Sequence, residues 1–173
     1  CLKYIGLGDL TIFVNFGVLP VFGTYWVQTQ TFSLLPILWS IPIVLFTVGI
    51  LHANNWHDIR SDTSKECKTV AASLGEEGSS QYYKILTLGP FFLVCIYITV
   101  GLIPHSPVLV PAPILAIIVL LALPSALKLA RFKKEDDMKT FMMLDGKTAQ
   151  LQTQFAILLI VGLATSAMIP GIF

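Results

Sequence analysis

The chain has 173 residues, of which 55% are hydrophobic and only 12% are charged, and its mean hydropathy is +0.78. A soluble domain carries about twice that share of charged residues, so the composition excludes an ordinary soluble protein and indicates an integral membrane protein. The formal net charge of +1 gives no reason to expect a nucleic-acid partner, and three cysteines without CxxC or CxxH spacing favour neither a disulfide framework nor a zinc site.

Five apolar segments follow one another along the chain, at residues 10–27, 34–53, 85–102, 108–129 and 151–169. A helix needs about 20 mostly apolar residues to cross a bilayer. Glycine and proline interrupt the segments, and membrane helices tolerate both because neighbouring helices satisfy the freed backbone groups. The sequence therefore predicts an all-α fold: a polytopic transmembrane helix bundle of about five spans, forming one domain over residues 1–173.

The connections between these segments differ in charge. Two short ones, QTQTFS and PHSP, carry no formal charge, whereas residues 54–84 and 128–148 are predicted to be long, charged loops. Five spans place both charged loops, together with Lys3, on one membrane face, so that all 11 Lys and Arg residues lie there. The positive-inside rule assigns that face to the cytoplasm or to its organelle equivalent, such as the mitochondrial matrix.

The segment NNWHDIRSD, at residues 54–62, follows the second apolar run and is the main candidate site. Asn54, Asp58 and Asp62 are spaced four residues apart, so they share one face of a continuing helix. Two carboxylates at that spacing repel each other by about 0.2–0.5 kcal/mol, and a cation between them removes this repulsion. Oxygen ligands of this kind suit Mg²⁺, which commonly binds through one or two carboxylates plus substrate phosphates.

The neighbouring residues suit a phosphate ligand. Asn55 adds an amide oxygen, and Arg60 and Lys68 follow as cations that can meet phosphate oxygens. On spacing alone an alternative stays open, in which the segment is a solvated loop whose charges fix the topology. No Walker loop, GxSxG, HExxH or CxxCH motif occurs in the sequence, so it gives no support to NTP hydrolysis, esterase, zincin or c-type haem chemistry.

Four stretches together resemble the UbiA superfamily of membrane prenyltransferases. Residues 54–75, NNWHDIRSDTSKECKTVAASLG, are similar to the family's second aspartate-rich motif, and the closest pattern is that of the menaquinone-type (MenA-like) branch. KYIGLGD at residues 3–9 and GTYWVQ at residues 23–28 resemble the start and the end of the family's fifth helix, and GKTAQLQ at residues 146–152 resembles the entry to its last helix. The resemblance covers nearly the whole chain, in order.

This resemblance implies a fold, a reaction and a set of site residues. UbiA enzymes are bundles of nine transmembrane helices, to which these spans would contribute the last five. They use Mg²⁺ to transfer a prenyl group from an isoprenyl diphosphate to an aromatic acceptor, and the branch implies a quinone precursor such as dihydroxynaphthoate and a polyprenyl donor. By this comparison the catalytic and metal-binding residues are Asp58 and Asp62, and the substrate-binding residues are Asn54, Asn55, Arg60 and Lys68.

Two features depart from the family's pattern. The first aspartate-rich motif is absent from this chain, which opens on Cys1, and His57, Glu66 and Cys67 stand where the second motif has Arg, Gly and Lys. We therefore expect either the C-terminal part of an enzyme that works with the missing N-terminal helices, or a non-catalytic UbiA-like structural subunit that joins other membrane subunits, for example in a respiratory complex. A transporter or channel is a more distant interpretation, because no span carries an ionisable relay.

Overall fold

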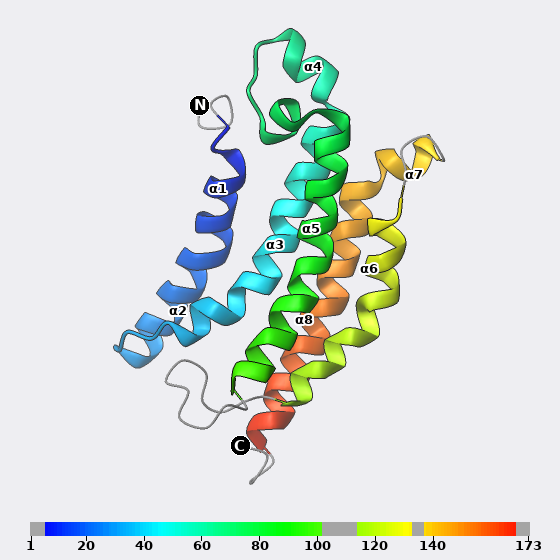
Figure 1. Cartoon of the computed structure of the whole chain (residues 1–173). Helices are drawn as coiled ribbons and strands as arrows, with labels where there is room; N and C mark the ends of the chain where they lie inside the picture. The colour runs from blue at the N-terminus through cyan, green and yellow to red at the C-terminus, as the bar shows by residue number, and fades with distance from the viewer. Residues whose placement is uncertain (1–5, 102–113, 133–136, 169–173) are drawn as a thin grey trace.

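The computed structural model describes residues 6–101, 114–132 and 137–168, which are mostly helical. The first rod consists of α1 (Gly8–Ile12), the π-helix η2 (Phe13–Val18) and α2 (Leu19–Thr29), and it is followed by α3 (Leu35–His57), α4 (Ile59–Ser64) and α5 (Val70–Gly101). The remaining elements are the 3-10 helix η3 (Ile114–Ala122), α6 (Leu123–Ala130), α7 (Met138–Met142) and α8 (Leu144–Met168). The predicted all-α bundle is confirmed (Figure 1).

Within the described residues, four helices are long and apolar enough to cross a membrane: Gly8–Thr29, Leu35–His57, Val70–Gly101 and Leu144–Met168. They correspond to four of the five predicted spans. The predicted span at residues 108–129 begins outside the described residues, and its described part belongs to the shorter apolar helix Ile114–Ala130, which η3 and α6 form together. Residues 102 and 169, which end the predicted third and fifth spans, also lie outside the described part of the chain.

The two charged segments contain more helix than the sequence predicts. Between residues 54 and 84, α3 continues to His57, α4 follows, and α5 already begins at Val70; α7 and the start of α8 likewise fall within residues 128–148. The predicted start of the third span at residue 85 is therefore wrong as a helix boundary. The chain bends within α5 at Gly75, whose φ of 67° lies in the left-handed region that glycine adopts most readily.

An aromatic cluster joins the three central helices. Phe46 of α3, Phe91 of α5 and Phe155 of α8 are buried, and their ring centroids lie 5.1–6.1 Å apart. Farther along α8, Gly162 approaches η3 so closely that a Cβ atom there would lie 2.7 Å from the Cα atom of Ala116. Such contacts through small residues let membrane helices pack backbone against backbone.

The first rod, from α1 to α2, contributes few buried residues. Asp9 is the buried residue of α1 and Gly17 that of η2, and Gly17 lies against the side chain of Val44 on α3. In Figure 1, α4 and α7 lie at the same end of the bundle, whereas the C-terminal end of α8 lies at the opposite end. The candidate segment around Asp58 and the short helix α7 are therefore neighbours at one end of the molecule.

Candidate functional site

The main candidate segment spans the junction between two helices. α3 ends at His57, Asp58 adopts a φ of −94° and a ψ of 5°, and α4 begins at Ile59. The backbone amide of Asp62 donates a hydrogen bond to the carbonyl oxygen of Asp58 at 2.8 Å, so one helical hydrogen bond still links the two aspartates. The single continuing helix expected from the sequence is nevertheless interrupted at Asp58, which redirects the side chains that follow it.

The four oxygen donors of this segment differ in burial. Asn55 and Asp62 are buried, with 2% and 8% of their surfaces exposed, whereas Asn54 and Asp58 are exposed. Within the described residues, the Oδ2 atom of Asp62 is buried without a hydrogen-bond partner. Leaving a buried acceptor unpaired is costly, so an atom of this kind calls for a physical reason such as a bound cation or water. Asp62 therefore faces the protein as a candidate ligand, while Asp58 lies at the surface.

The donor types of this segment, rather than their arrangement, suit a magnesium ion that is shared with a phosphate ligand. In the described part of the chain, no group of three or more His, Cys, Asp or Glu side chains is placed to hold a metal ion. Two carboxylates and an amide oxygen match Mg²⁺, because this ion keeps several waters and takes its remaining ligands from substrate phosphates. A closed metal site built from protein ligands alone would need more donors than this segment brings together.

The predicted cations lie on the outside of the same region. Arg60 on α4 and Lys68 before α5 are both exposed. Lys68 lines a cavity of about 610 Å³, together with Thr63, Glu66, Cys67, Ala72 and Ser73. Neither Asp58 nor Asp62 is among the residues that line this cavity, so the structure does not bring the carboxylates and Lys68 to one cavity.

Glu66 has a φ of 56°, in the left-handed region. Residues with a Cβ atom adopt this conformation at a cost, and glycine does not. The motif that this segment resembles has glycine at this position, and the observed φ supplies the backbone reason for it. Glu66 therefore brings both backbone strain and a negative charge to the cavity beside Lys68.

The residues between the asparagines and Asp58 are engaged in packing. The indole Nε1 of Trp56 donates a hydrogen bond to the Glu76 carboxylate at 2.7 Å. The rings of Trp56 and His57 pack against Phe141 of α7, with centroids 5.1 and 4.6 Å away, and Nε2 of His57 also contacts the Phe141 carbonyl oxygen. His57 is therefore a packing residue here, neither a solvated loop histidine nor a group presented to phosphate.

A second buried carboxylate lies on α1. Asp9 is 7% exposed, and within the described residues neither carboxylate oxygen has a partner at good hydrogen-bonding geometry, although the Tyr82 hydroxyl group of α5 lies beside it. Tyr82 packs edge-on against the His52 ring, with centroids 4.7 Å apart. Sequence reasoning could not find Tyr82 and His52, because only the packing of α3 and α5 brings them together.

The sequence matches one family model over residues 1–151, and that model describes the UbiA prenyltransferase family. The chain belongs to the UbiA prenyltransferase family. The family-level resemblance drawn from the aspartate-rich motif is thereby confirmed, and the menaquinone-type branch stays a prediction.

Curated relatives from animals and an amoeba are similar to this chain. It is 32% identical to UbiA prenyltransferase domain-containing protein 1 of Mus musculus over 171 residues, 97% of this chain and 46% of that protein. The protein of the same name from Homo sapiens is 31% identical over 173 residues, 98% of this chain and 47% of that protein. The one from Dictyostelium discoideum is 44% identical over 87 residues, 50% of this chain and 26% of that protein. The chain spans about half the length of the first two, and no solved structure matches it.

Proposed function

We propose that this chain binds the diphosphate group of an isoprenyl donor and supports transfer of the prenyl group to an aromatic acceptor. Membership of the UbiA prenyltransferase family is the observation that carries the proposal. The buried carboxylate oxygen of Asp62, which has no partner within the described residues, supports the choice of site. Because the family's first aspartate motif is not in this sequence, the proposal assigns to the chain the second aspartate motif of the diphosphate site.

The residues of the candidate segment have complementary roles in this proposal. Asp58 and Asp62 would hold Mg²⁺, with Asn54 and Asn55 supplying further amide oxygens, and the ion when bound would neutralise charge on the leaving diphosphate. Arg60 and Lys68 are exposed on the flank of the segment and would contact the diphosphate oxygens. An allylic diphosphate ionises more readily when its leaving group is neutralised, because the carbocation that forms is delocalised.

The finer chemistry follows from the motif's resemblance to the menaquinone-type branch. We propose a quinone-ring acceptor such as dihydroxynaphthoate and a long polyprenyl donor, both reaching the site from the bilayer. We also propose that the site faces the cytoplasm or the mitochondrial matrix, because the predicted loops carry the Lys and Arg residues. The position of α4 and α7 at one end of the bundle supports a single charged face (Figure 1).

Replacing the two aspartates tests the metal assignment. In the protein as expressed in its membrane, Asp58→Asn and Asp62→Asn should each lower the rate of prenyl transfer by about 10²–10³-fold and raise the Mg²⁺ concentration needed for half-maximal rate. Glu77→Gln is the matched control for Asp58→Asn, because it also neutralises an exposed carboxylate near this end but lies outside the motif. If the wild-type protein is active and both aspartate variants keep its rate, the assignment is wrong.

A structural role in a membrane assembly is the second candidate, and the departures from the motif favour it. Glu66 adds negative charge beside Lys68 in the cavity, and His57 is engaged with Phe141. Both changes make the region less suited to a diphosphate, whose charge needs cationic neighbours. In this case wild-type protein should transfer no prenyl group, and purification under mild detergent should recover membrane proteins that remain bound to it.

A further inference from the structure

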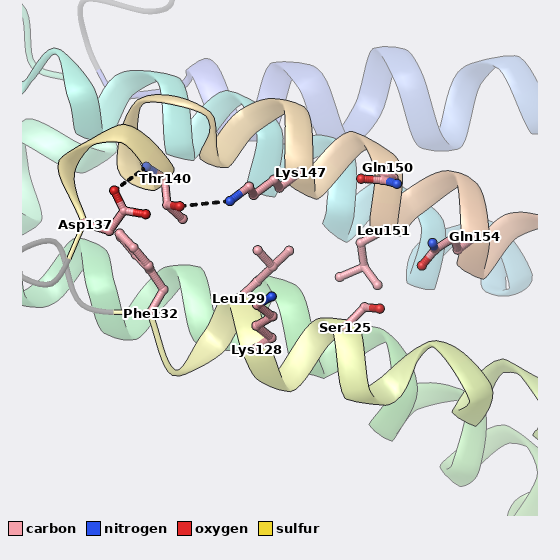
Figure 2. Close-up of a pocket in the computed structure, with 10 residues that line it drawn as sticks. All are labelled: Ser125, Lys128, Leu129, Phe132, Asp137, Thr140, Lys147, Gln150, Leu151 and Gln154. Atoms are coloured by element: carbon pink, nitrogen blue, oxygen red, sulfur yellow. Dashed lines mark hydrogen bonds between the residues drawn. The ribbon is translucent and has the colours of Figure 1, made fainter.

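A groove of about 510 Å³ opens between α6 and α8 and is closed at one end by α7 (Figure 2). Its position differs from that of the candidate prenyl-transfer site, because none of Asn54, Asn55, Asp58 and Asp62 lines it. Ten described residues, from the three helices and the ends next to them, line it: Ser125, Lys128, Leu129, Phe132, Asp137, Thr140, Lys147, Gln150, Leu151 and Gln154.

Two polar rows face each other across this groove. On α8, Lys147, Gln150 and Gln154 are spaced three and four residues apart, so they lie on one face of the helix. Ser125 and Lys128 line the groove from α6, and Figure 2 shows Lys147 reaching along α8 toward Thr140 at the α7 end of the groove. Polar donors from two helices therefore converge on one space.

The floor of the groove is apolar. Leu129 is 8% and Leu151 2% exposed, and both belong to the hydrophobic core beneath the polar rows. The ring of Phe132 adds a further apolar wall near α7. A ligand that fills the groove therefore needs a polar, hydrogen-bonding part and a hydrocarbon part.

Among the described residues that line the groove, two lysines face one carboxylate, so their net charge is positive. The Nζ atom of Lys147 donates a hydrogen bond to Oγ1 of Thr140 at 3.0 Å, and neither Lys147 nor Lys128 forms an ion pair among the described residues. Asp137 is the carboxylate among the lining residues, and it caps α7 by accepting hydrogen bonds from the amides of Lys139 and Thr140. Hydrogen bonds from the Thr140 side chain and then from these amides lower the pKa of Asp137, and the positive charge of Lys147 lowers it further, so Asp137 offsets part of the Lys147 charge, while Lys128 makes no such contribution.

The groove penetrates into the spanning part of α8. Gln154 lies ten residues after Leu144, the first residue of α8, which corresponds to about 15 Å along a helix. Gln150 and Gln154 are exposed on this membrane-length helix, and polar side chains at membrane depth are costly unless they meet a polar partner. An amphiphile with its head group near the lysines would give both glutamines an acceptor and would cover the leucines with its chain.

We propose that this groove is a binding site for an anionic phospholipid of the surrounding bilayer, whose phosphate group is held by Lys128 and Lys147. Ser125 and Gln150 donate hydrogen bonds to the oxygens next to the phosphate, and the acyl chains lie along Leu129 and Leu151. A lipid matches the groove better than a soluble phosphate does, because a soluble phosphate has no hydrocarbon part that could contact the apolar floor.

Native mass spectrometry of the purified protein with defined lipids measures this binding. The probes are phosphatidylglycerol, which is anionic, and phosphatidylcholine, which has no net charge. The affinity for phosphatidylglycerol should fall about fivefold in Lys128→Gln and in Lys147→Gln, and about 25-fold in the double variant, because each lysine near an anionic lipid contributes about that factor. Affinity for phosphatidylcholine should not change.

Lys139→Gln is the matched control. Lys139 is exposed on α7 and does not line the groove, so its loss changes the net charge equally and should leave phosphatidylglycerol affinity within about twofold of wild type. Circular dichroism and the thermal midpoint show whether the lysine variants still fold; variants that unfold are replaced by Ser125→Ala and Gln150→Ala, which should weaken binding without changing charge.

Three results would overturn the proposal. In the first, the lysine variants fold and keep wild-type affinity, or the control loses as much as they do. In the second, inorganic diphosphate displaces the lipid at equal concentration, which makes the groove a site for soluble phosphate. In the third, geranylgeranyl diphosphate binds in a lysine-dependent way and phosphatidylglycerol does not, which assigns the groove to an isoprenyl donor.

Discussion

Gly162 gives the sharpest test of how the helices pack. A Cβ atom at this position would lie 2.7 Å from the Cα atom of Ala116 and 2.7 Å from the carbonyl oxygen of Leu115, whereas ordinary contacts begin at 3.4 Å. α8 and η3 would therefore have to separate by about 0.7 Å at this point, and the obstructing atoms are backbone, which cannot move aside alone. Overpacking of this kind destabilises a protein by about 1–3 kcal/mol.

Gly146→Ala provides the matched control because it makes the same substitution in the same helix. Apart from its chain neighbours and the backbone of its own helix, no described atom lies within 4 Å of a Cβ atom built at Gly146, so alanine there should be neutral or should stabilise α8 by up to about 1 kcal/mol through its better helix propensity. The difference between the two variants isolates the packing cost at Gly162. A chain of this size shifts its thermal midpoint by about 2–4 °C per kcal/mol.

Thermal unfolding in detergent, followed by circular dichroism, measures both variants. We expect Gly162→Ala to unfold at a lower temperature than wild type and Gly146→Ala to unfold at the same or a higher temperature. If Gly162→Ala raises the midpoint as much as Gly146→Ala does, the close approach of α8 to η3 is wrong.

Three other changes have defined outcomes. Glu66→Gly should stabilise the protein by up to about 1 kcal/mol, since it relieves a left-handed φ of 56° at the cost of glycine's flexibility, and it should strengthen binding of inorganic diphosphate because it removes a negative charge. Gln30→Gly, at a φ of 53°, is the control, which should give the same gain in stability and no gain in binding. If both variants bind diphosphate equally well, the negative charge of Glu66 does not weaken binding. The pKa of Asp137 is lowered in the folded protein, so the stabilisation that its carboxylate gives to α7 is complete above the ordinary value of 3.8 and is lost as the pH falls through the lowered pKa. Pepsin should therefore cleave α7 faster with decreasing pH in wild type. It should not do so in Asp137→Asn, because asparagine still caps the helix and does not titrate. Tyr83→Phe removes a buried 2.6 Å hydrogen bond to Thr148 and should lower the unfolding free energy by about 0.5–1.5 kcal/mol, and an unchanged midpoint would show that this bond contributes nothing.

Hydropathy predicted the helices well and their ends poorly. The apolar core of each span is a strong signal, because about 20 residues without charge have few other stable conformations. α5 shows why the helix ends were predicted poorly. It begins at Val70, and its N-terminal part carries charged residues such as Glu76 and Glu77, whose low hydropathy predicts a loop. Helix resumes directly after the bend at Gly75, where Trp56 hydrogen-bonds to Glu76 and α3 packs along α5, and hydropathy does not record such tertiary contacts.

The candidate site was predicted in its residue types but not in its arrangement. The four-residue spacing predicts that Asn54, Asp58 and Asp62 share one face of a helix, and this would hold only if α3 continued through Asp58. The turn at Asp58 sends Asp62 inward and leaves Asp58 outside, and no propensity in the sequence marks this break. The left-handed φ at Glu66 could not be predicted either, because a glycine is the usual sequence signal for such a φ and this chain has Glu66 where the motif has glycine.

The short helix α7 links the two polar regions at this end of the bundle. A five-residue helix is not stable alone, so the position of α7 depends on what it touches on each side. On one side Phe141 packs against Trp56 and His57, at the end of α3 that leads into Asp58. On the other side Thr140 receives the hydrogen bond from Lys147 in the groove. Adjacent residues of one helical turn therefore make both contacts, which places α7 between the groove and the aspartate segment.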